Sequence, residues 1–330
     1  MPASHAMSAS ATVPIEVHLT DDDLHETLRE EVAAGLTADP KWLSPKWFYD
    51  DRGSELFDEI TRLPEYYPTE AERRILARHA AEIAAATGAE VLVELGSGTS
   101  DKTRLLLDAL VATGVHTFVP FDVSEGILRY AAAVLDDRYP DLGVVGVVGD
   151  FERHLDELPT PGCRTVALLG STIGNLDPEQ RACFLATMAE VLEPGEALLL
   201  GTDLIKDRPR LLAAYDDPGG VTAAFNRNVL AVLNRELGAD FELASFDHEA
   251  RWNEPQHRIE MWLRSSEAQT VQVADLGLSV DFARGEGVRT ELSTKFDRDL
   301  VTADVCAAGF RAAGWWTDDP GDFAVSLWRR

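Results

Sequence analysis

Basic side chains are scarce in this chain. Its 330 residues hold 30 lysines and arginines against 57 aspartates and glutamates, for a formal net charge of −27. Binding to nucleic acid requires a basic face that neutralises phosphates, and attraction to an anionic membrane requires the same charge. The composition therefore argues against both partners and is typical of a solvated, soluble surface.

Cysteines and long apolar runs are also few. The three cysteines (Cys163, Cys183 and Cys306) form neither a CxxC pair nor a disulfide framework, so we expect a reducing, cytoplasmic location. No apolar run approaches the roughly 20 residues of a membrane span.

Residues 1–14 lack the basic start and apolar centre of a signal peptide, so we expect them to be disordered. The eight histidines form no HxxxH or HxH cluster, and no metal is expected.

Apolar strands alternate with helical segments between residues 71 and 203. The predicted strands are Val91–Leu95, Thr117–Asp122, Gly143–Val148, Thr165–Leu169 and Ala197–Thr202. The predicted helices are Lys102–Ala112, Glu125–Asp137 and Pro178–Leu192. Asp177 and Gln180 predict a capping box at the start of the last helix. Strands separated by helices imply right-handed crossovers, so we expect an α/β fold with a doubly wound, Rossmann-like core.

The flanking segments follow a different pattern. Residues 15–70 are helical and loop-rich, with no predicted strand. Further helices are predicted at Leu211–Tyr215, Val221–Leu237 and Asp299–Ala308. Antiparallel strands are predicted at Phe241–Phe246, Arg258–Arg264 and Thr270–Val273, with a terminal hairpin over Gly314–Trp328. We therefore expect a core of residues 71–203 and 293–330, and a discontinuous α+β domain of residues 15–70 and 204–292.

A glycine-rich turn, Gly96-Ser97-Gly98-Thr99-Ser100, directly follows the strand Val91–Leu95. Glycines in such a turn let a ligand approach backbone N–H groups that a Cβ would block. The third glycine of the dinucleotide pattern GxGxxG is missing, and Asp101 at the helix start would repel a pyrophosphate. We therefore expect a nucleoside ligand without phosphates and disfavour a nicotinamide-dependent oxidoreductase.

Acidic residues end the next two predicted strands. Asp122 can accept both hydroxyls of a ribose, and Asp150 can accept from an adenine amino group while Phe151 packs on the ring. Ligands of open α/β sheets bind at the carboxyl ends of the strands. Each feature is common by itself, but their order resembles the class I S-adenosylmethionine-dependent methyltransferases. S-adenosylmethionine is therefore the expected cofactor, with S-adenosylhomocysteine as its product.

Longer motifs carry a more specific resemblance. They are Lys46-Trp47-Phe48-Tyr49-Asp50, Leu63-Pro64-Glu65-Tyr66-Tyr67-Pro68-Thr69, Leu169-Gly170-Ser171-Thr172-Ile173-Gly174-Asn175, Ala214-Tyr215-Asp216, Glu260-Met261-Trp262 and Thr290-Glu291-Leu292-Ser293. Over about residues 20–330 the chain resembles the L-histidine Nα-methyltransferases of ergothioneine biosynthesis. The resemblance implies three methyl transfers to the α-amine of free L-histidine, giving the betaine hercynine, and a substrate-binding domain that closes over the methyltransferase core.

The resemblance also implies which side chains hold the substrate. Neutral donors that avoid positive charge beside a sulfonium are expected on the histidine carboxylate: Tyr66, Asn175 and Tyr215. The residues expected around the imidazole ring are Glu291, Ser293 and Met261, and Phe57 is expected to wall the site. In an extended segment, the spacing of Glu291 and Ser293 puts both on one face. By residue type alone, Tyr66 suits a packing tyrosine, Asn175 a helix cap and Met261 a core gap-filler.

The cofactor residues implied by the resemblance are Tyr49, Gly96, Lys102, Asp122, Asp150 and Phe151. Lys102 is expected to meet the methionine carboxylate, although it also suits a solvated helix. The residues expected around the reacting atoms are Tyr49, Gly170 and Asn175. Tyr49 is the candidate proton acceptor if the reaction uses one.

Two other functions stay open from the sequence. The acceptor can be another amino acid or small amine, or the chain can bind S-adenosylmethionine without catalysis. A small-molecule substrate is expected in either methyltransferase reading. The absence of a long apolar stripe predicts a monomer.

Overall fold

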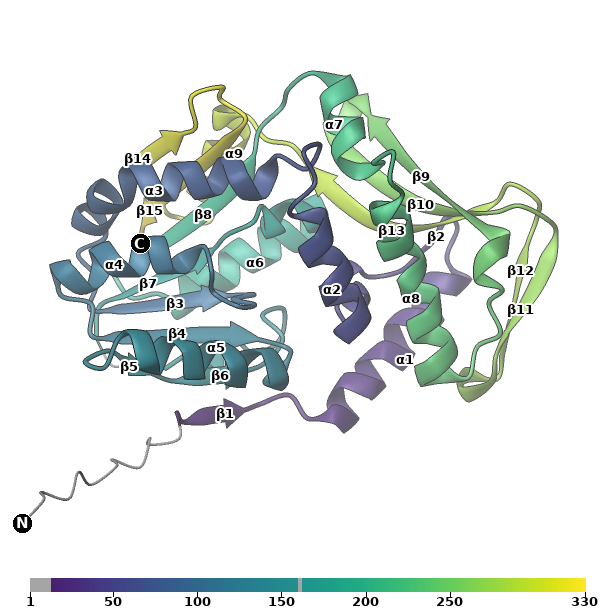
Figure 1. Cartoon of the computed structure of the whole chain (residues 1–330), viewed down its shortest axis with the longest axis horizontal. Coiled ribbons are helices and arrows are strands. Elements are labelled where there is room, and N and C mark those ends of the chain that lie inside the picture. The colour runs from purple at the N-terminus through teal and green to yellow at the C-terminus, as the bar shows by residue number, and fades with distance from the viewer. Residues whose placement is uncertain (1–12, 160–161) are drawn as a thin grey trace, which may run out of the picture.

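Within residues 13–159 and 162–330, which the computed structural model describes, a nine-stranded sheet forms the centre of the larger part of the molecule (Figure 1). Its spatial order is β1 (Ile15–Val17), β6 (Gly146–Val148), β4 (Thr117–Asp122), β3 (Val91–Leu95), β7 (Arg164–Leu168), β8 (Ala197–Asp203), β15 (Phe323–Arg329) and β14 (Arg311–Thr317). The short β5 (Gly143–Val144) pairs with β4. The pairs β8–β15 and β15–β14 are antiparallel, and the remaining pairs of this sheet are parallel.

Helices cover both faces of this sheet. They are α3 (Pro68–Thr87), α4 (Thr103–Thr113), α5 (Glu125–Arg138), α6 (Pro178–Val191) and α9 (Arg298–Ala307). Alternate residues of a strand point to opposite faces. Val91 and Val93 of β3 accordingly join the core cluster under α6 and α9, whereas Leu92 joins the cluster under α3, α4 and α5. The doubly wound α/β core is therefore confirmed.

Several predicted elements are confirmed almost to the residue. β3 and β4 have the predicted bounds, and the terminal hairpin forms from β14 and β15. At the start of α6, Asp177 accepts from the backbone N–H of Gln180 at 2.9 Å, and the Gln180 side chain accepts from Asp177 N at 3.0 Å. This reciprocal capping box satisfies donors that the first helical turn would leave unpaired.

A second sheet and its helices lie beside the larger one (Figure 1). Its order is β2 (Lys41–Trp42), β13 (Gly287–Thr294), β10 (Arg258–Ser265) and β9 (Phe246–Asn253). β11 (Gln269–Val273) and β12 (Leu278–Phe282) form a separate hairpin. The associated helices are α1 (Asp21–Thr37), α2 (Asp51–Ile60), α7 (Arg208–Tyr215) and α8 (Val221–Leu237).

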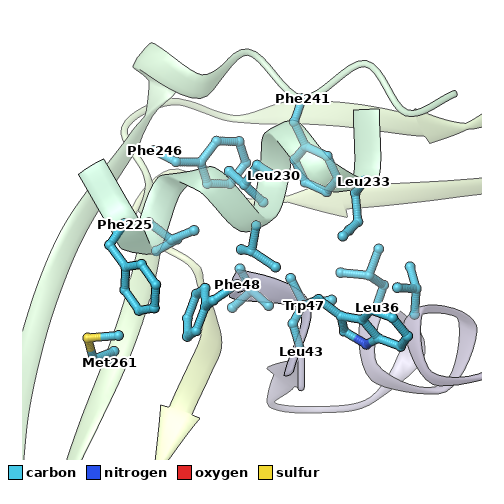
Figure 2. Packing of buried hydrophobic residues seen from close by; sticks show 14 of the residues in the cluster. Leu36, Leu43, Trp47, Phe48, Phe225, Leu230, Leu233, Phe241, Phe246 and Met261 are labelled. Atoms are coloured by element: carbon cyan, nitrogen blue, oxygen red, sulfur yellow. The ribbon is translucent and has the colours of Figure 1, made fainter. Parts of the chain in front are cut away.

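One hydrophobic cluster unites segments that are far apart along the chain. Phe48 of the short 3-10 helix η1 (Pro45–Phe48) stacks at 4.6 Å against Phe225 of α8. Phe246 and Met261 come from β9 and β10, and they join the same cluster (Figure 2). Burial of each of these apolar side chains contributes about 1.5–3 kcal/mol, and together they stabilise the packing of the N-terminal helices against the insertion after β8.

The prediction that residues 15–70 contain no strand is wrong. β1 pairs in parallel with β6, and β2 pairs in parallel with β13. Both strands are only two or three residues long, so they carry no readable alternation of polar and apolar side chains. Their strand conformation comes from partners more than 100 residues away.

The strand predicted at Phe241–Phe246 is also wrong. Residues Leu243–Ser245 form a short 3-10 helix, η4, and β9 begins only at Phe246. The Asn234 side chain accepts from the N–H of Phe241 at 2.9 Å and donates to its carbonyl at 2.8 Å, and so replaces a strand partner.

The single strand predicted at Gly143–Val148 is divided into β5 and β6. β12 and β13 were not predicted as strands.

Candidate active site

The glycine turn after β3 is open on one side. Gly96 N donates to the carbonyl of Phe121 at 2.8 Å, and Gly98 N donates to Asp122 Oδ2 at 3.0 Å. Gly96 and Gly98 have φ values of +65° and +50°, and no described atom lies within 4 Å of where a Cβ would stand. The sequence predicted this meeting of the turn with Asp122, and the backbone there is accessible to a ligand.

Three buried oxygens near the turn have no hydrogen-bond partner within the described residues: Glu94 Oε2, Ser97 Oγ and Ser100 Oγ. Burial raises the pKa of Glu94 to about 8, against the opposing effect of its hydrogen bond from Thr103. Buried polar atoms are nearly always paired in proteins. The unsatisfied oxygens and the open backbone therefore fit a polar ligand laid across the turn.

Asp150 and Phe151 follow β6, as predicted for adenine recognition. Asp150 Oδ2 already accepts from Lys46 Nζ at 3.1 Å, and Oδ1 accepts from Glu152 N at 2.9 Å. Phe151 is half-buried, with its ring edge-on to Phe184 at 6.0 Å. The Asp150 carboxylate is thus held in place by Lys46, a partner that the sequence did not reveal.

Lys102 and Gly170 meet at a buried acid of α3. Glu72 is completely buried; its Oε1 accepts from Gly170 N at 2.8 Å, and its Oε2 pairs with Lys102 Nζ. Glu72 therefore ties the start of α4 to the carboxyl end of β7. An acidic residue of a helix usually faces water, so nothing in the local sequence marked this residue.

The aromatic residues of the predicted substrate site form a continuous row. Tyr49 and Phe57 lie 5.4 Å apart, Phe57 and Tyr66 6.1 Å, and Tyr66 and Tyr215 6.3 Å, all edge-on. Phe225, which was not predicted, packs against both Tyr49 and Phe57. The structure thus brings Tyr49, Phe57 and Tyr66, from the stretch around α2, together with Tyr215 at the end of α7.

The phenol of Tyr49 does not suit the role of a proton acceptor. Although 40% of the residue is exposed, burial of its hydroxyl raises the pKa of Tyr49 above the ordinary value, and the charge of Glu291 adds to the shift. A phenol of raised pKa stays protonated at neutral pH. Tyr49 can donate a hydrogen bond, but it is a poor base.

Glu291 and Ser293 occupy one face of β13, as their spacing predicted. Glu291 pairs with Met261 across the β10–β13 ladder, and Ser293 pairs with Ile259. Met261 is 1% exposed and belongs to the hydrophobic cluster of Figure 2. It therefore fills the core directly beside Glu291, so its packing role and a contact with a ligand ring are compatible.

The Glu291 carboxylate lacks a hydrogen-bond donor among the described residues. Burial raises its pKa to about 7, while the positive charge of Lys295 opposes that shift. The residue is half-buried and is therefore reachable. Such a carboxylate gains most from a ligand that brings its own N–H group.

Glu291→Gln should make the ligand-free protein more stable at alkaline pH. The folded-state pKa is raised, so the ionised carboxylate costs folding free energy once the pH exceeds its ordinary value of 4.5. We expect the variant to gain about 1–3 kcal/mol at about pH 8 and nothing below about pH 4.5. Urea unfolding at both pH values measures the difference, with the exposed Glu190→Gln as a control. A gain that is equal at both pH values would contradict the assignment.

A buried ammonium lies behind Tyr215 and Ser293. Lys295 is completely buried, and its Nζ is 2.8 Å from both Tyr215 Oη and Ser293 Oγ. The two hydroxyls are 2.7 Å apart. The expected neutral donor Tyr215 therefore has a positive charge directly behind it, which the sequence analysis did not predict. Lys295 follows Ser293 by two residues, just as Ser293 follows Glu291. In an extended segment this spacing puts all three side chains on one face, so the sequence could have indicated that Lys295 belongs to the site.

Asp203 balances the charge of Lys295. Its Oδ2 is 2.8 Å from Lys295 Nζ, and it also pairs with Lys206 and accepts from Tyr67 Oη. Burial opposes ionisation of Asp203, but the two ammonium groups outweigh it and hold its pKa below the ordinary value. Asp203 ends β8, so the network joins the large sheet to β13.

Asn175 lies where the two sheets approach each other. It ends the short 3-10 helix η3 (Thr172–Asn175), and a Cβ on its neighbour Gly174 would stand 2.8 Å from the Thr294 carbonyl of β13. η3 is therefore packed directly on the strand that carries Glu291. Asp177 rather than Asn175 caps α6, so the Asn175 side chain does not serve as the helix cap.

Comparison with known proteins identifies the family. A family described as histidine-specific, SAM-dependent methyltransferases matches residues 28–330. The chain belongs to this family. It is 58% identical to the histidine N-alpha-methyltransferase of Mycolicibacterium smegmatis and 56% identical to that of Mycobacterium tuberculosis. Each alignment covers 96% of this chain, with 99% and 98% of the respective relatives. A solved S-adenosylmethionine-dependent methyltransferase from Clostridium acetobutylicum is 10% identical, with a TM-score of 0.47 over 84% of this chain and 98% of that chain.

The described residues of this histidine-specific methyltransferase hold no group of three or more His, Cys, Asp or Glu side chains that could bind a metal ion. In the same residues, no helix is both long and apolar enough to cross a membrane.

Gly174→Ala should reduce methyltransferase activity by displacing η3. The new methyl group would meet a backbone oxygen rather than a mobile side chain, so η3 must move away from β13. We expect kcat/KM to fall by about 10–100-fold, as is usual for small misplacements in an active site. The matched control is Gly126→Ala in α5, where no described atom lies within 4 Å of the new Cβ. Steady-state kinetics of both variants test this, and wild-type activity in Gly174→Ala would contradict it.

Proposed function

We propose that the chain transfers three methyl groups from S-adenosylmethionine to the α-amine of L-histidine, giving hercynine within ergothioneine biosynthesis. The family match and the names of the two mycobacterial relatives support this acceptor. The structural observation that carries the proposal is the half-buried Glu291 carboxylate, which no described residue hydrogen-bonds and which suits an imidazole N–H.

Apart from Tyr49, which follows η1, the cofactor residues of the proposal lie at or after the carboxyl ends of β3, β4 and β6 in the chain. Asp122 would hold the ribose, Asp150 and Phe151 the adenine, and Lys102 the methionine carboxylate. Gly96 and Tyr49 would border the cofactor. The open glycine turn and the unsatisfied Glu94, Ser97 and Ser100 oxygens support the fit of this group to the site.

The substrate residues of the proposal come from both sheets. Tyr66, Asn175 and Tyr215 would hold the histidine carboxylate, and Glu291 and Ser293 would read the imidazole. Phe57 would close one side, and Met261 would support the ring. Gly170 would keep the backbone close to the reacting atoms, since the glycine has a φ of +73° and its N–H is held by Glu72.

Positioning would supply most of the rate. S-adenosylmethionine, when bound, supplies an activated methyl group, so the residues of this chain need only align the amine and exclude water. The raised pKa of Tyr49 disfavours proton transfer to it. The α-amine, whose pKa in model peptides is about 7.7–8.0, can lose its proton to solvent before the site closes.

The presence of two sheets supports the division of the chain into a substrate-binding domain and a methyltransferase core. We assign residues 15–70 and 204–292 to a substrate-binding domain, and residues 71–203 and 293–330 to the methyltransferase core. β1 pairs within the large sheet, so Ile15–Val17 belong structurally with the core side of that division. Of residues 1–14, which were expected to be disordered, 1–12 lie outside the described residues, whereas the Pro14 carbonyl accepts from Gly146 N at 3.0 Å. A cytoplasmic monomer without nucleic-acid or membrane partners remains part of the proposal.

The deciding experiment offers each free amino acid to the purified protein with S-adenosylmethionine and identifies products by mass spectrometry. Mono-, di- and trimethylhistidine from histidine alone would support the proposal. Methylation of a different acceptor would keep the cofactor and overturn the roles of Glu291 and Ser293. Tight cofactor binding without any methylation would indicate a non-catalytic binding protein.

A further inference from the structure

Three buried polar side chains from α8, β9 and β13 form a hydrogen-bonded set that we call the Asn226 network: Asn226, His248 and Thr290. Asn226 Nδ2 lies 2.8 Å from His248 Nδ1. Thr290 Oγ1 lies 2.6 Å from Asn226 Oδ1, closer than to the Met261 carbonyl at 3.2 Å. Asn226 and Thr290 are completely buried, and the His248 side chain is 2% exposed. Buried polar groups are costly unless they are paired, so the partners of each member matter.

Two backbone carbonyls, which can only accept, fix the direction of these hydrogen bonds. Asn226 Nδ2 donates to the Trp262 carbonyl at 3.1 Å, so its second hydrogen points at His248 Nδ1 and its Oδ1 accepts from Thr290. His248 Nε2 lies 2.9 Å from the Tyr215 carbonyl and must donate to it. His248 is therefore a neutral imidazole with its proton on Nε2. Burial lowers the pKa of the His248 ring, against the opposing effect of the hydrogen bond to Tyr215, and so favours this neutral form.

One end of the Asn226 network holds the end of α7. This helix ends at Tyr215, and carbonyl groups in the last turn of a helix have no partner within the helix. The His248 ring supplies a donor to the Tyr215 carbonyl. In the proposed function the Tyr215 hydroxyl serves the substrate carboxylate, whereas this bond uses only the backbone. His248 can therefore hold Tyr215 in place without competing with the substrate.

The other end of the Asn226 network holds a β-bulge beside Glu291. The register of β13 on β10 passes from Glu291 directly to Arg289, so Thr290 is the extra residue of the bulge. A bulge interrupts the ladder and re-aims side chains, and bulges are common beside active sites. Thr290 donates to Asn226, and Asn226 donates to the Trp262 carbonyl at the register shift. The network thus stabilises the irregular backbone that leads into Glu291.

We infer that Asn226, His248 and Thr290 are positioning residues for the amino-acid substrate, because their hydrogen bonds fix the separation of Tyr215 and Glu291. The inference rests on the proposed function, which assigns these two residues to opposite ends of histidine. A fixed separation selects a substrate whose ring N–H stands at one distance from its carboxylate. The polar atoms of Asn226 and His248 all bind protein atoms, so the network acts on the reaction through Tyr215 and Glu291.

Asn234 provides a matched control for Asn226. Both asparagines lie on α8 and satisfy backbone groups, since the Asn234 side chain bonds the N–H and the carbonyl of Phe241. Phe241 is not among the residues assigned to the substrate. Asn226→Ala and Asn234→Ala should therefore both destabilise the fold, but only Asn226→Ala should weaken histidine binding.

His248 offers a second matched pair of variants. His248→Leu removes both ring nitrogens, whereas the amide of His248→Gln keeps one donor and one acceptor. The glutamine variant should therefore restore most of what the leucine variant loses. A role confined to folding stability would leave the KM of the folded enzyme unchanged in both.

The test is steady-state kinetics with histidine, together with calorimetric titration of S-adenosylmethionine. We expect KM for histidine to rise about tenfold in His248→Leu, Asn226→Ala and Thr290→Val, because small displacements of substrate-holding groups are costly. In these variants kcat should stay within about threefold and the cofactor Kd within about twofold of wild type. His248→Gln and Asn234→Ala should raise KM less than about threefold. An unchanged KM in His248→Leu, or equal increases in Asn226→Ala and Asn234→Ala, would overturn the inference.

The protonation of the His248 ring keeps the inference testable if the variants do not fold. Two-bond proton–nitrogen correlation spectra of the wild type, grown with isotope-labelled histidine, show which ring nitrogen carries the proton. We expect a neutral His248 ring with its proton on Nε2 at about pH 7.5, both before and after addition of S-adenosylhomocysteine and unlabelled histidine. A proton on Nδ1, or a charged ring, would overturn the inference. A wild type that does not methylate histidine would instead refute the proposed function itself.

Discussion

Replacing Glu291 with leucine is expected to lower kcat/KM for histidine by about 10³-fold, while the Kd of S-adenosylmethionine changes less than about twofold. The carboxylate has no described donor of its own, so its only hydrogen bond in the complex would come from the substrate. Without it, the imidazole N–H is buried against an apolar side chain and loses its hydration without compensation.

Two features of this variant make the kinetic result interpretable. Burial already disfavours the Glu291 charge, so its removal should not destabilise the fold. Glu190→Leu, at an exposed position of α6, provides the control for a change from acid to leucine. Initial rates over a histidine range, together with calorimetric titration of the cofactor, measure both quantities. A parallel loss of histidine and cofactor binding would place Glu291 outside the imidazole site.

Replacing Asp203 with asparagine is expected to destabilise the protein by about 3–5 kcal/mol, because it leaves two buried ammonium groups without a counter-charge. Lys206 and Lys295 are both buried, and Lys295 reaches no solvent. Part of the cost can be relieved by deprotonation of Lys206, whose pKa is already lowered to about 8 by burial. Denaturant unfolding at neutral pH measures the loss.

The pH dependence of that loss separates charge from packing. The folded-state pKa of Asp203 lies below its ordinary value of 3.8, so its contribution is full above that pH and declines as the pH falls further. The difference between wild type and Asp203→Asn should therefore narrow below about pH 4. The exposed Asp141→Asn should stay within about 0.5 kcal/mol of wild type throughout. A loss under about 1 kcal/mol at neutral pH would show that the network is not charge-coupled.

Much of the architecture could be predicted from short-range patterns. β3, β4 and the capping box of α6 follow from apolar runs, turn residues and cap chemistry within a few positions of each other. The meeting of the glycine turn with Asp122 follows from the rule that parallel strands end at one edge of the sheet. These features depend on local geometry, which a sequence displays directly.

The pairing of distant segments could not be predicted in the same way. β1 and β2 are too short to show a period, and Asn234 replaces a strand partner at Phe241. The supports of the site are also distant in sequence. Lys46 holds Asp150, and Glu72 holds Lys102, in each case across 30 or more positions.

The sequence by itself determined the doubly wound core, the ligand edge of the sheet and the shared face of Glu291 and Ser293, because each depends on strand and helix periods. Only the tertiary structure decided which charges those residues face. Lys295 is paired with Asp203, the last residue of β8 in the other sheet. Burial and long-range pairing set the pKa shifts of the site, and these cannot be predicted from neighbouring residues in the sequence.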